Sequence, residues 1–420
     1  MKKLTLMLAL MSMVYWAGAQ SINLSNAYEA QNRGYLVKAK GYIDQASEHA
    51  DTKAEAKTWF YKTLIYCKIG GAIVNPQTKA ERKEGQNLAK VCPHWYSTAF
   101  EALFAWQQFD KEGEYTDKIK RFFPYLGNTY YNMAVTEYEK SNFDMAMNYC
   151  DSAIMLANVF RNDDLSNNAY YLAGCAAQST RNTDLTKKYF QPLVTAKVSP
   201  KSVKFDVKMV YEALFTTYYK EGDTVKAMRT ARAFTQACKT DYNAHVLMAT
   251  AFIYSGNNEQ ALKSINMALT LAEKDSAQLP VALCRAASIY DLSKQFDKAE
   301  ECYRKSLALN SNQYEANYGQ GIMLYNRAVD KVNAASEVPV EDETGLYDKL
   351  NEEAKQLFSA SVPYFKGAIS YIDGLTNEDD IAVNRPNLGR CLTALRTVYA
   401  RVNQSEELKE VNARLEALQK

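Results

Sequence analysis

The chain has 420 residues, 47% of them apolar and 23% charged, and its 50 basic and 48 acidic side chains nearly cancel. This composition is typical of a folded globular protein and excludes a disordered or collagen-like chain. The near-neutral charge also argues against a nucleic-acid binder, because binding to phosphates needs a surplus of basic side chains.

The first twenty residues, MKKLTLMLALMSMVYWAGAQ, have the features of a bacterial secretory signal peptide. Two lysines precede a mostly apolar run over 4–16, and small residues at 17–19 mark a cleavage point. We predict that residues 1–19 are removed and that the mature protein, with 48 basic and 48 acidic residues, is exported to the periplasm or beyond. We expect no integral membrane segment afterwards, because no later run approaches about 18 apolar residues.

A sequence repeat of about 34 residues recurs along the chain, and its clearest copy spans 280–312. Small residues stand at Ala287, Ala299 and Ser306, with large apolar residues three or four positions away. Small side chains let two helix backbones approach, and the large ones fill the flanking grooves. Each copy therefore predicts two short antiparallel helices.

Other copies are recognised by the same small positions. A good copy at 127–159 has Ala134, Ala146 and Ala153, and another at 245–275 has Ala249, Ala261 and Ala268. A degenerate copy places Gly174 at its first crossing with Phe190 nearby, and a later helix offers Ala360 and Gly367. We divide the mature chain into N-terminal helix pairs at 20–126 with an insertion at 70–94, a central array at 127–313, a pair at 314–380 interrupted at 330–344, and capping helices at 381–420.

This pattern resembles the tetratricopeptide repeat (TPR) family. The resemblance implies an all-α solenoid of seven or eight helix pairs, stacked into a superhelix with a concave groove. Segments 39–70, 99–135 and 395–418 further resemble exported TPR proteins of Bacteroidetes-type bacteria, a group generally without an assigned activity. The resemblance therefore implies a fold more firmly than a function.

The sequence offers little chemistry, and we expect no catalytic, cofactor or metal site. Cys92-Pro93-His94 supplies two ligands where a structural zinc needs four, and no Gly-x-Ser-x-Gly elbow occurs. Gly319-Gln320-Gly321 is better explained by close helix packing than by a phosphate loop. A cryptic helical hydrolase with two inward carboxylates stays open as an alternative.

Eight cysteines in an exported protein raise the question of disulfides. Cys150, Cys175, Cys284 and Cys302 lie inside repeat helices, several at or beside packing positions where cysteine behaves as a small hydrophobe, so we expect mainly buried free thiols. Cys67 and Cys92 are the exception that we consider, because a bond between them would bracket the 70–94 insertion.

The face of each first helix opposite the crossings is expected to line the concave groove. Tyr and Asn dominate it, and both suit hydrogen bonding to an extended peptide. We expect a non-enzymatic scaffold that binds a peptide or protein partner there; a glycan or peptidoglycan-fragment binder is the alternative, and several tyrosines could instead pack between repeats. The groove residues are Asn128, Tyr131, Tyr138, Asn168, Tyr171, Glu212, Tyr219, Asn243, Tyr254, Arg285, Asp291, Tyr318, Tyr325 and Asn326.

Overall fold

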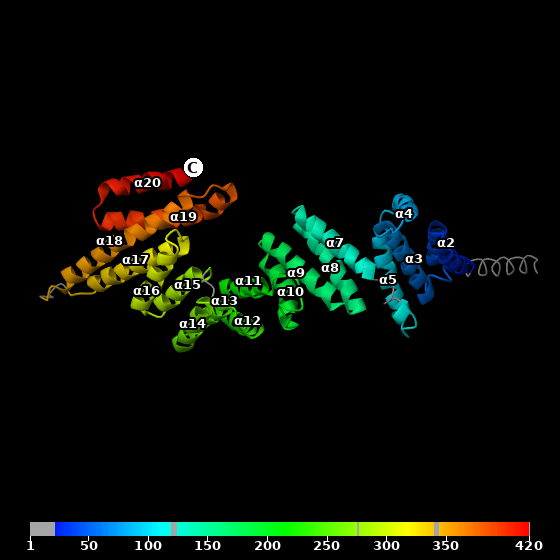
Figure 1. Ribbon diagram of the computed structural model, residues 1–420, viewed down its shortest axis with the longest axis horizontal. Coiled ribbons are helices and arrows are strands. Elements are labelled where there is room, and N and C mark those ends of the chain that lie inside the picture. The colour runs from blue at the N-terminus through cyan, green and yellow to red at the C-terminus, as the bar shows by residue number, and fades with distance from the viewer. Residues whose placement is uncertain (1–21, 119–123, 275–276, 340–343, 420) are drawn as a thin grey trace, which may run out of the picture. The chain divides into compact units, whose positions relative to one another are not determined.

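The computed structural model describes residues 22–118, 124–274, 277–339 and 344–419 (Figure 1). These residues form helices joined by short turns and include no strand, which confirms the all-α fold class. The predicted signal peptide lies outside the described residues. No helix within the described ranges is both long and apolar enough to cross a membrane.

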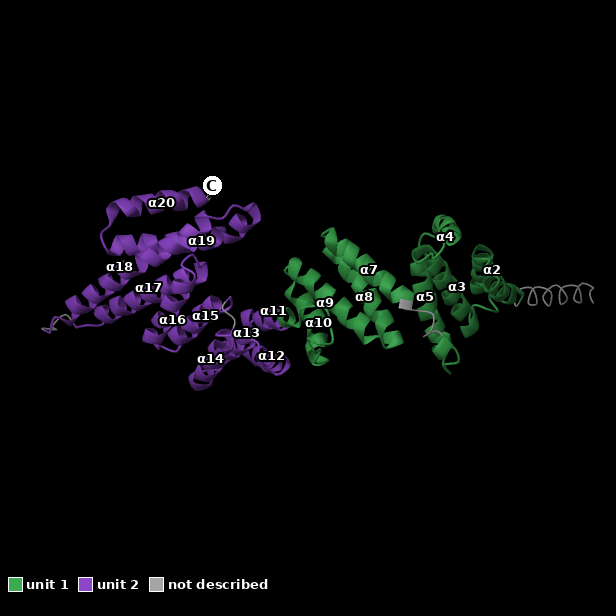
Figure 2. Ribbon diagram, in the orientation of Figure 1, with its two compact units in different colours: residues 1–210 green, residues 211–420 purple. Residues whose placement is uncertain are grey.

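The chain divides into two compact units, residues 1–210 and 211–420 (Figure 2). The boundary falls inside α11 (Val207–Lys220) and therefore within the array predicted at 127–313. Unit 1 contains a helix at 22–32 followed by α2 (Leu36–Glu48), α3 (Ala56–Val74), α4 (Lys79–Val91), α5 (Trp95–Phe109), α7 (Pro124–Glu139), α8 (Phe143–Phe160), α9 (Asp163–Ser179) and α10 (Thr183–Thr195).

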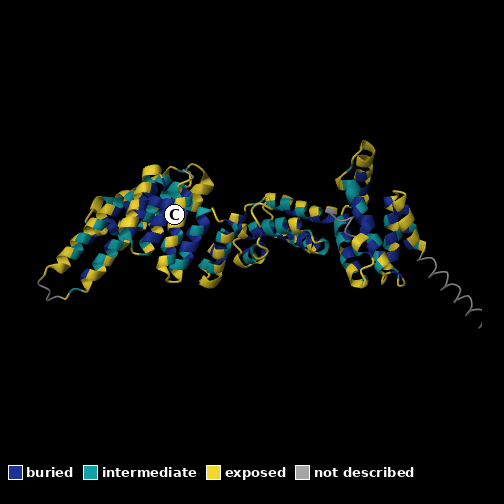
Figure 3. Ribbon diagram, turned by 60° about the horizontal axis from the view of Figure 1, so that its bottom comes forward, coloured by how far each residue is buried: buried dark blue, intermediate teal, exposed yellow. Residues whose placement is uncertain are grey.

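Unit 2 continues with helices that pack in chain order, each against its neighbours in sequence. They are α12 (Thr224–Ala237), α13 (Tyr242–Tyr254), α14 (Asn258–Ala272), α15 (Leu279–Leu292), α16 (Phe296–Leu309), α17 (Tyr314–Ser336), α18 (Leu346–Asp373), α19 (Glu378–Arg401) and α20 (Ser405–Gln419). Figure 3 shows buried residues where helices face one another and exposed residues on the outer surfaces.

The turns inside hairpins follow from two residue types. Gly222 and Gly256 adopt φ of 75° and 74°, a left-handed conformation that glycine reaches without a steric penalty. The next residue caps the second helix: Asp223 accepts a hydrogen bond from the amide of Lys226, and Asn257 from that of Gln260. A glycine followed by Asp or Asn thus ends one helix and starts the next.

The predicted crossings are confirmed in the clear copies of the repeat. All eight alanines named for those copies, in three hairpins, are fully buried, as is Ser306. Gly174 abuts Phe190 so closely that a Cβ added there would overlap the phenyl ring. Gly319 and Gly321 lie inside α17 and abut Tyr303 and Phe365, so they are packing positions as expected.

Two features differ from the sequence interpretation, and the predicted insertion at 70–94 contains a helix of its own between α3 and its partner α5. The 70–94 stretch is largely helical: it contains the end of α3 and all of α4, whose Gly85 lies against the Ala72 carbonyl. The interruption expected from residue 330 begins later, because α17 continues to Ser336 and forms a long hairpin with α18. The expected crossing at Ala360 is wrong: Ala360 is exposed, and the neighbouring Ser361 is buried instead.

Candidate functional site

An open cavity of about 730 Å³ lies in unit 2 between α17, α19 and α20. Two predicted groove residues, Tyr318 and Tyr325, form its α17 wall, and both are half-buried. Leu415 and Leu418 of α20 close another side. These leucines belong to the apolar stripe of the last helix, which packs on α19 and leaves their side chains partly accessible.

Helix α19 supplies the rest of the lining through its residue spacing. The lining positions from 382 to 397 repeat at intervals of three and four residues, with adjacent pairs such as 385–386 and 389–390, which places them on one helical face. Gly389 opens the middle of this face, because a Cβ added there would meet nothing within 4 Å. The lining residues from α19 are Ala382, Arg385, Pro386, Gly389, Arg390, Thr393, Ala394 and Thr397. At about 100° per residue, Arg385 and Arg390 lie about 140° apart around the helix and therefore on opposite sides of that face.

The cavity lining is basic, with two arginines and no acidic side chain among the described residues that form it. Arg385 Nη2 donates to the Leu418 carbonyl oxygen at 2.6 Å, and Arg390 Nη1 donates to Asn387 Oδ1 at 3.4 Å. Burial raises the pKa of Tyr318, Cys391 adds to the rise, and the Arg390 guanidinium opposes it. Most donor positions of the two guanidinium groups are thus available to a ligand.

The other predicted residues of unit 2 form separate contacts. The rings of Tyr219 and Tyr254 meet edge to face with centroids 4.6 Å apart. Burial is the largest cause, and the hydrogen bond with Tyr254 the second, that raises the pKa of Tyr219 to about 12. Arg285 Nη1 donates to Asn243 Oδ1 at 3.0 Å, and Asn243 in turn donates to Glu212.

Asp291 and Asn326 do not line the cavity. Asp291 is half-buried; desolvation raises its pKa, Arg327 opposes this rise and Asp330 adds to it. Asn326 is exposed. Of the predicted residues in this unit, only Tyr318 and Tyr325 line the described cavity together. The Asn243 amide is hydrogen-bonded to Glu212 and Arg285.

The predicted residues of unit 1 pack mainly against their own chain. Tyr171 stacks on Phe205 with ring centroids 4.3 Å apart, and Tyr138 meets Phe143 edge-on at 5.4 Å. Tyr131 and Asn168 are half-buried, and Asn128 is exposed. The alternative that several tyrosines are packing residues applies to Tyr138 and Tyr171.

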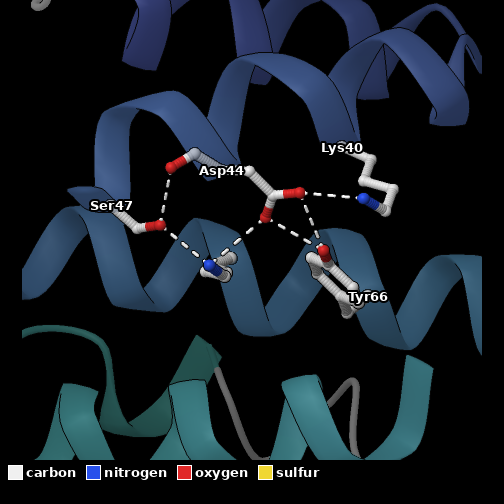
Figure 4. Close-up of polar contacts among 5 residues, drawn as sticks. Lys40, Asp44, Ser47 and Tyr66 are labelled. Atoms are coloured by element: carbon white, nitrogen blue, oxygen red, sulfur yellow. Dashed lines mark hydrogen bonds and ion pairs between the residues drawn. The ribbon is translucent and has the colours of Figure 1, made fainter. Parts of the chain in front are cut away.

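A polar cluster joins α2 to α3 in unit 1 (Figure 4). The Asp44 carboxylate accepts hydrogen bonds from Lys40 Nζ and from the Tyr66 hydroxyl, each at 2.9 Å, and pairs with Lys62 Nζ at 3.2 Å. Lys62 also donates to Ser47 Oγ at 2.8 Å. Because the carboxylate is saturated by its own chain, we interpret this cluster as a link between helices and not as a binding site.

All eight cysteines are free thiols in the structure, so the Cys67–Cys92 bond is not formed there. Seven are buried and Cys175 is half-buried. Desolvation is the largest cause that raises the pKa of Cys150 and Cys284 to about 12 and that of Cys175 to about 11. A raised pKa is the opposite of what a nucleophilic or metal-binding cysteine needs.

Residues 280–313 match the tetratricopeptide repeat family. Among solved structures, the chain is similar to YrrB, a TPR protein described with an unusual peptide-binding site, at 18% identity and a TM-score of 0.34, over 44% of this chain and 88% of that one. It is also similar to the C-terminal part of a TPR protein from Cytophaga hutchinsonii, at 14% identity and a TM-score of 0.36, over 64% of this chain and 95% of that one. Human IFIT1, solved as a dimer with m7Gppp-AAAA, matches at 15% identity and a TM-score of 0.32, over 95% of this chain and 90% of that one. A search of curated proteins found no match.

The α19 side of the cavity was missed from the sequence. The tetratricopeptide pattern points to tyrosines on the first helix of each pair, and it assigns α19 to the C-terminal cap. A usable signal exists in the row Ala382, Pro386, Gly389 and Thr393, where small residues recur on one helical face beside two arginines. Such a row of small residues leaves a cavity only when no neighbouring helix packs on it. The sequence does not reveal whether a helix does so.

Proposed function

We propose that this protein is a non-enzymatic interaction scaffold of the bacterial cell envelope, and that it binds a peptide segment of a partner protein in the cavity between α17, α19 and α20. The observation that carries this proposal is the pairing of Tyr318 and Tyr325 on one wall of a 730 Å³ hollow with two arginines on the other. Large aromatic surface beside a few polar groups is typical of ligand sites.

The size of the cavity supports a short segment and not a whole folded domain. Its volume lies within the range of about 300–1,000 Å³ that small ligands occupy. Tyr residues offer contact area at a low entropic cost, and the threonine hydroxyls of α19 provide further hydrogen-bonding groups. These hydroxyls would also suit a sugar, so a glycan binder is the competing outcome of the test.

Filling the cavity tests the proposal without removing any contact. Gly389→Leu places a side chain into open space and replaces a mid-helix glycine, so the fold should gain stability by up to about 1 kcal/mol. We expect peptides selected from a phage-displayed library on the mature protein to bind this variant at least about tenfold more weakly, a loss of about 1.4 kcal/mol.

Gly41→Leu is the matched control, because Gly41 is an exposed mid-helix glycine of α2 that also faces open space. It should leave peptide binding unchanged. Selected peptides that bind Gly389→Leu as well as the wild type would disprove the cavity as the site. Enrichment on a glycan array with no enriched peptide would favour the sugar alternative.

Export belongs to the same proposal and rests on the leader-like first residues. Envelope fractionation of the native host, with the intact mass of the recovered protein, tests it. A mature chain that begins at Gln20 would support export, and a full-length cytoplasmic chain would refute it.

A further inference from the structure

We propose that a second surface of unit 2, the groove between α14 and α16, binds an amphipathic helix of a partner protein. The bound helix lies antiparallel to α14 and α16 and places its apolar face on α15. This groove is separate from the cavity of the proposed function, because the two share no lining residue.

The groove exists because α15 packs closely on both α14 and α16 (Figure 1). Within the part of the chain that the structure describes, α14 and α16 do not pack closely on each other. The space between them is a cavity of about 510 Å³, and Leu283 and Tyr290 of α15 form its buried floor. One face of α16 forms a wall, since its lining residues lie three, four, seven, ten and eleven positions after Lys298.

The lining is apolar or charged and offers few neutral hydrogen-bonding groups. Among the described residues that form it, the neutral polar side-chain groups are the weak Cys302 thiol and the Tyr290 hydroxyl, which already donates to Asn266 Oδ1 at 2.7 Å. The helical walls pair their own backbone groups. An extended peptide or a sugar would therefore give up hydrogen bonds to water without replacing them. A helix satisfies its own backbone and can bury an apolar face here.

Two charged residues lie at opposite ends of this groove. Lys298 is in the first turn of α16, with its ammonium 5.7 Å from the centre of the Tyr290 ring, and Glu273 follows the last residue of α14. Because α14 and α16 are both antiparallel to α15, they run in the same direction, which separates the two charges along the groove. Lys305 pairs with Glu301 at 2.7 Å, whereas Lys298 and Glu273 have no ion-pair partner among the described residues.

Both of these charges oppose the dipole of their own helix. A helix N-terminus is partly positive and favours acids, and a C-terminus favours bases. The adjacent Asp297 and Lys274 follow this rule and do not line the groove, whereas Lys298 and Glu273 break it and do line it. An antiparallel helix would place its positive N-terminus beside Glu273 and its negative C-terminus beside Lys298. The charges of the groove therefore complement a helix in that direction, while an alkyl chain would meet a charge with its apolar tail.

The length of the groove sets the size of the bound helix. Lys298 and Leu309 are eleven residues apart in α16, a rise of about 16 Å. This length matches about three helical turns. The partner helix should then present apolar residues at positions i, i+3 or i+4, and i+7 to Leu283 and Leu309.

A phage-displayed library built on one helical template, with one face randomised, tests the proposal on the mature protein. We expect enriched peptides with apolar residues at these spacings. A central proline should weaken their binding at least about tenfold, because it breaks the helix. A benzophenone at the peptide N-terminus should crosslink to residues 269–279, and one at the C-terminus to residues 290–298.

Leu309→Gln should weaken the selected peptides at least about tenfold, since it removes an apolar contact of the groove. Leu309 is 57% exposed, so the change should leave the fold intact. Leu292→Gln is the matched control, because Leu292 is a 52% exposed leucine of α15 outside the groove, and it should leave binding unchanged. Exchanging the end charges, Lys298→Glu with Glu273→Lys, should weaken binding at least about threefold.

No enriched helical peptide, equal binding by Leu309→Gln and the wild type, tolerance of the central proline, or the opposite crosslinking pattern would each overturn the inference. Saturation-transfer NMR that shows dodecanoate bound to the wild type but not to Leu309→Gln, with no helix enriched, would assign the groove to an alkyl chain and also overturn it. Gly389→Leu leaves this groove unchanged, so it should not affect the selected helices. Failure of the proposed function is therefore distinguishable from failure of this inference.

Discussion

Raising the pH from about 9 to about 10 should lower the free energy of unfolding of each unit by about 2 kcal/mol. Desolvation raises the pKa of Cys150 in unit 1 and Cys284 in unit 2 from 9.0 to about 12, and that of Cys175 in unit 1 and of Cys302 and Cys391 in unit 2 to about 11. In this range the unfolded chain loses thiol protons that the folded chain keeps, so the unfolded state binds fewer protons and stability falls as pH rises. Below pH 9 the stabilisation is fully present.

Urea unfolding at a series of pH values, followed by circular dichroism, measures this effect. A Cys150→Ala/Cys175→Ala variant supplies the control, because it removes two of the titrating thiols of unit 1 and should flatten the slope of that transition. Partly exposed thiols contribute less because solvent screens them. If the urea midpoint stays constant from pH 8 to pH 10, the thiols ionise equally in both states and our account of their burial is wrong.

Phe190→Ala should cost about 3–5 kcal/mol in the free energy of unfolding of unit 1, the range for losing a fully buried phenyl ring. Phe190 fills the space that Gly174 leaves on α9, so its removal opens a cavity at the α9–α10 crossing. Chemical denaturation of the variant and the wild type under the same conditions gives the difference.

The pairing of Gly174 with Phe190 can be isolated by a double-mutant cycle. Gly174→Ala alone should destabilise by about 1–3 kcal/mol, because its methyl group would overlap the ring. Combined with Phe190→Leu, it should cost less than the sum of the single changes. Gly41→Ala is the control, since it meets no neighbour and should stabilise by up to about 1 kcal/mol. Strict additivity would show that the two positions do not interact.

The architecture of this chain was predictable because close helix packing requires small residues at particular positions in the local sequence. Gly174 and Ala299 mark crossings that only small residues allow, and Gly256 followed by Asn257 marks a turn. The end of α17 was not predictable in this way. Four of the seven residues at 330–336 are polar, which suggests a loop, yet the segment continues a helix that packs along one side against α18.

The candidate site was predictable only in part, for a similar reason. Helical spacing identified Tyr318 and Tyr325, which line the cavity, but it selected Tyr171 with equal weight, and Tyr171 stacks on Phe205. Whether an inward aromatic residue meets a ligand or its own chain depends on what the neighbouring helices leave open. Gly389 creates such an opening, and a single helix pattern does not reveal it.

The burial of the thiols also determines how the folded chain would respond to an oxidant. Disulfide exchange proceeds through the thiolate, and a thiol with a pKa above 9.0 is less than about 1% ionised at neutral pH. Seven of the eight sulfurs are also shielded from solvent by neighbouring helices. Disulfide mispairing is therefore slow once the helices have packed, so the thiols are vulnerable to oxidation mainly before each hairpin closes.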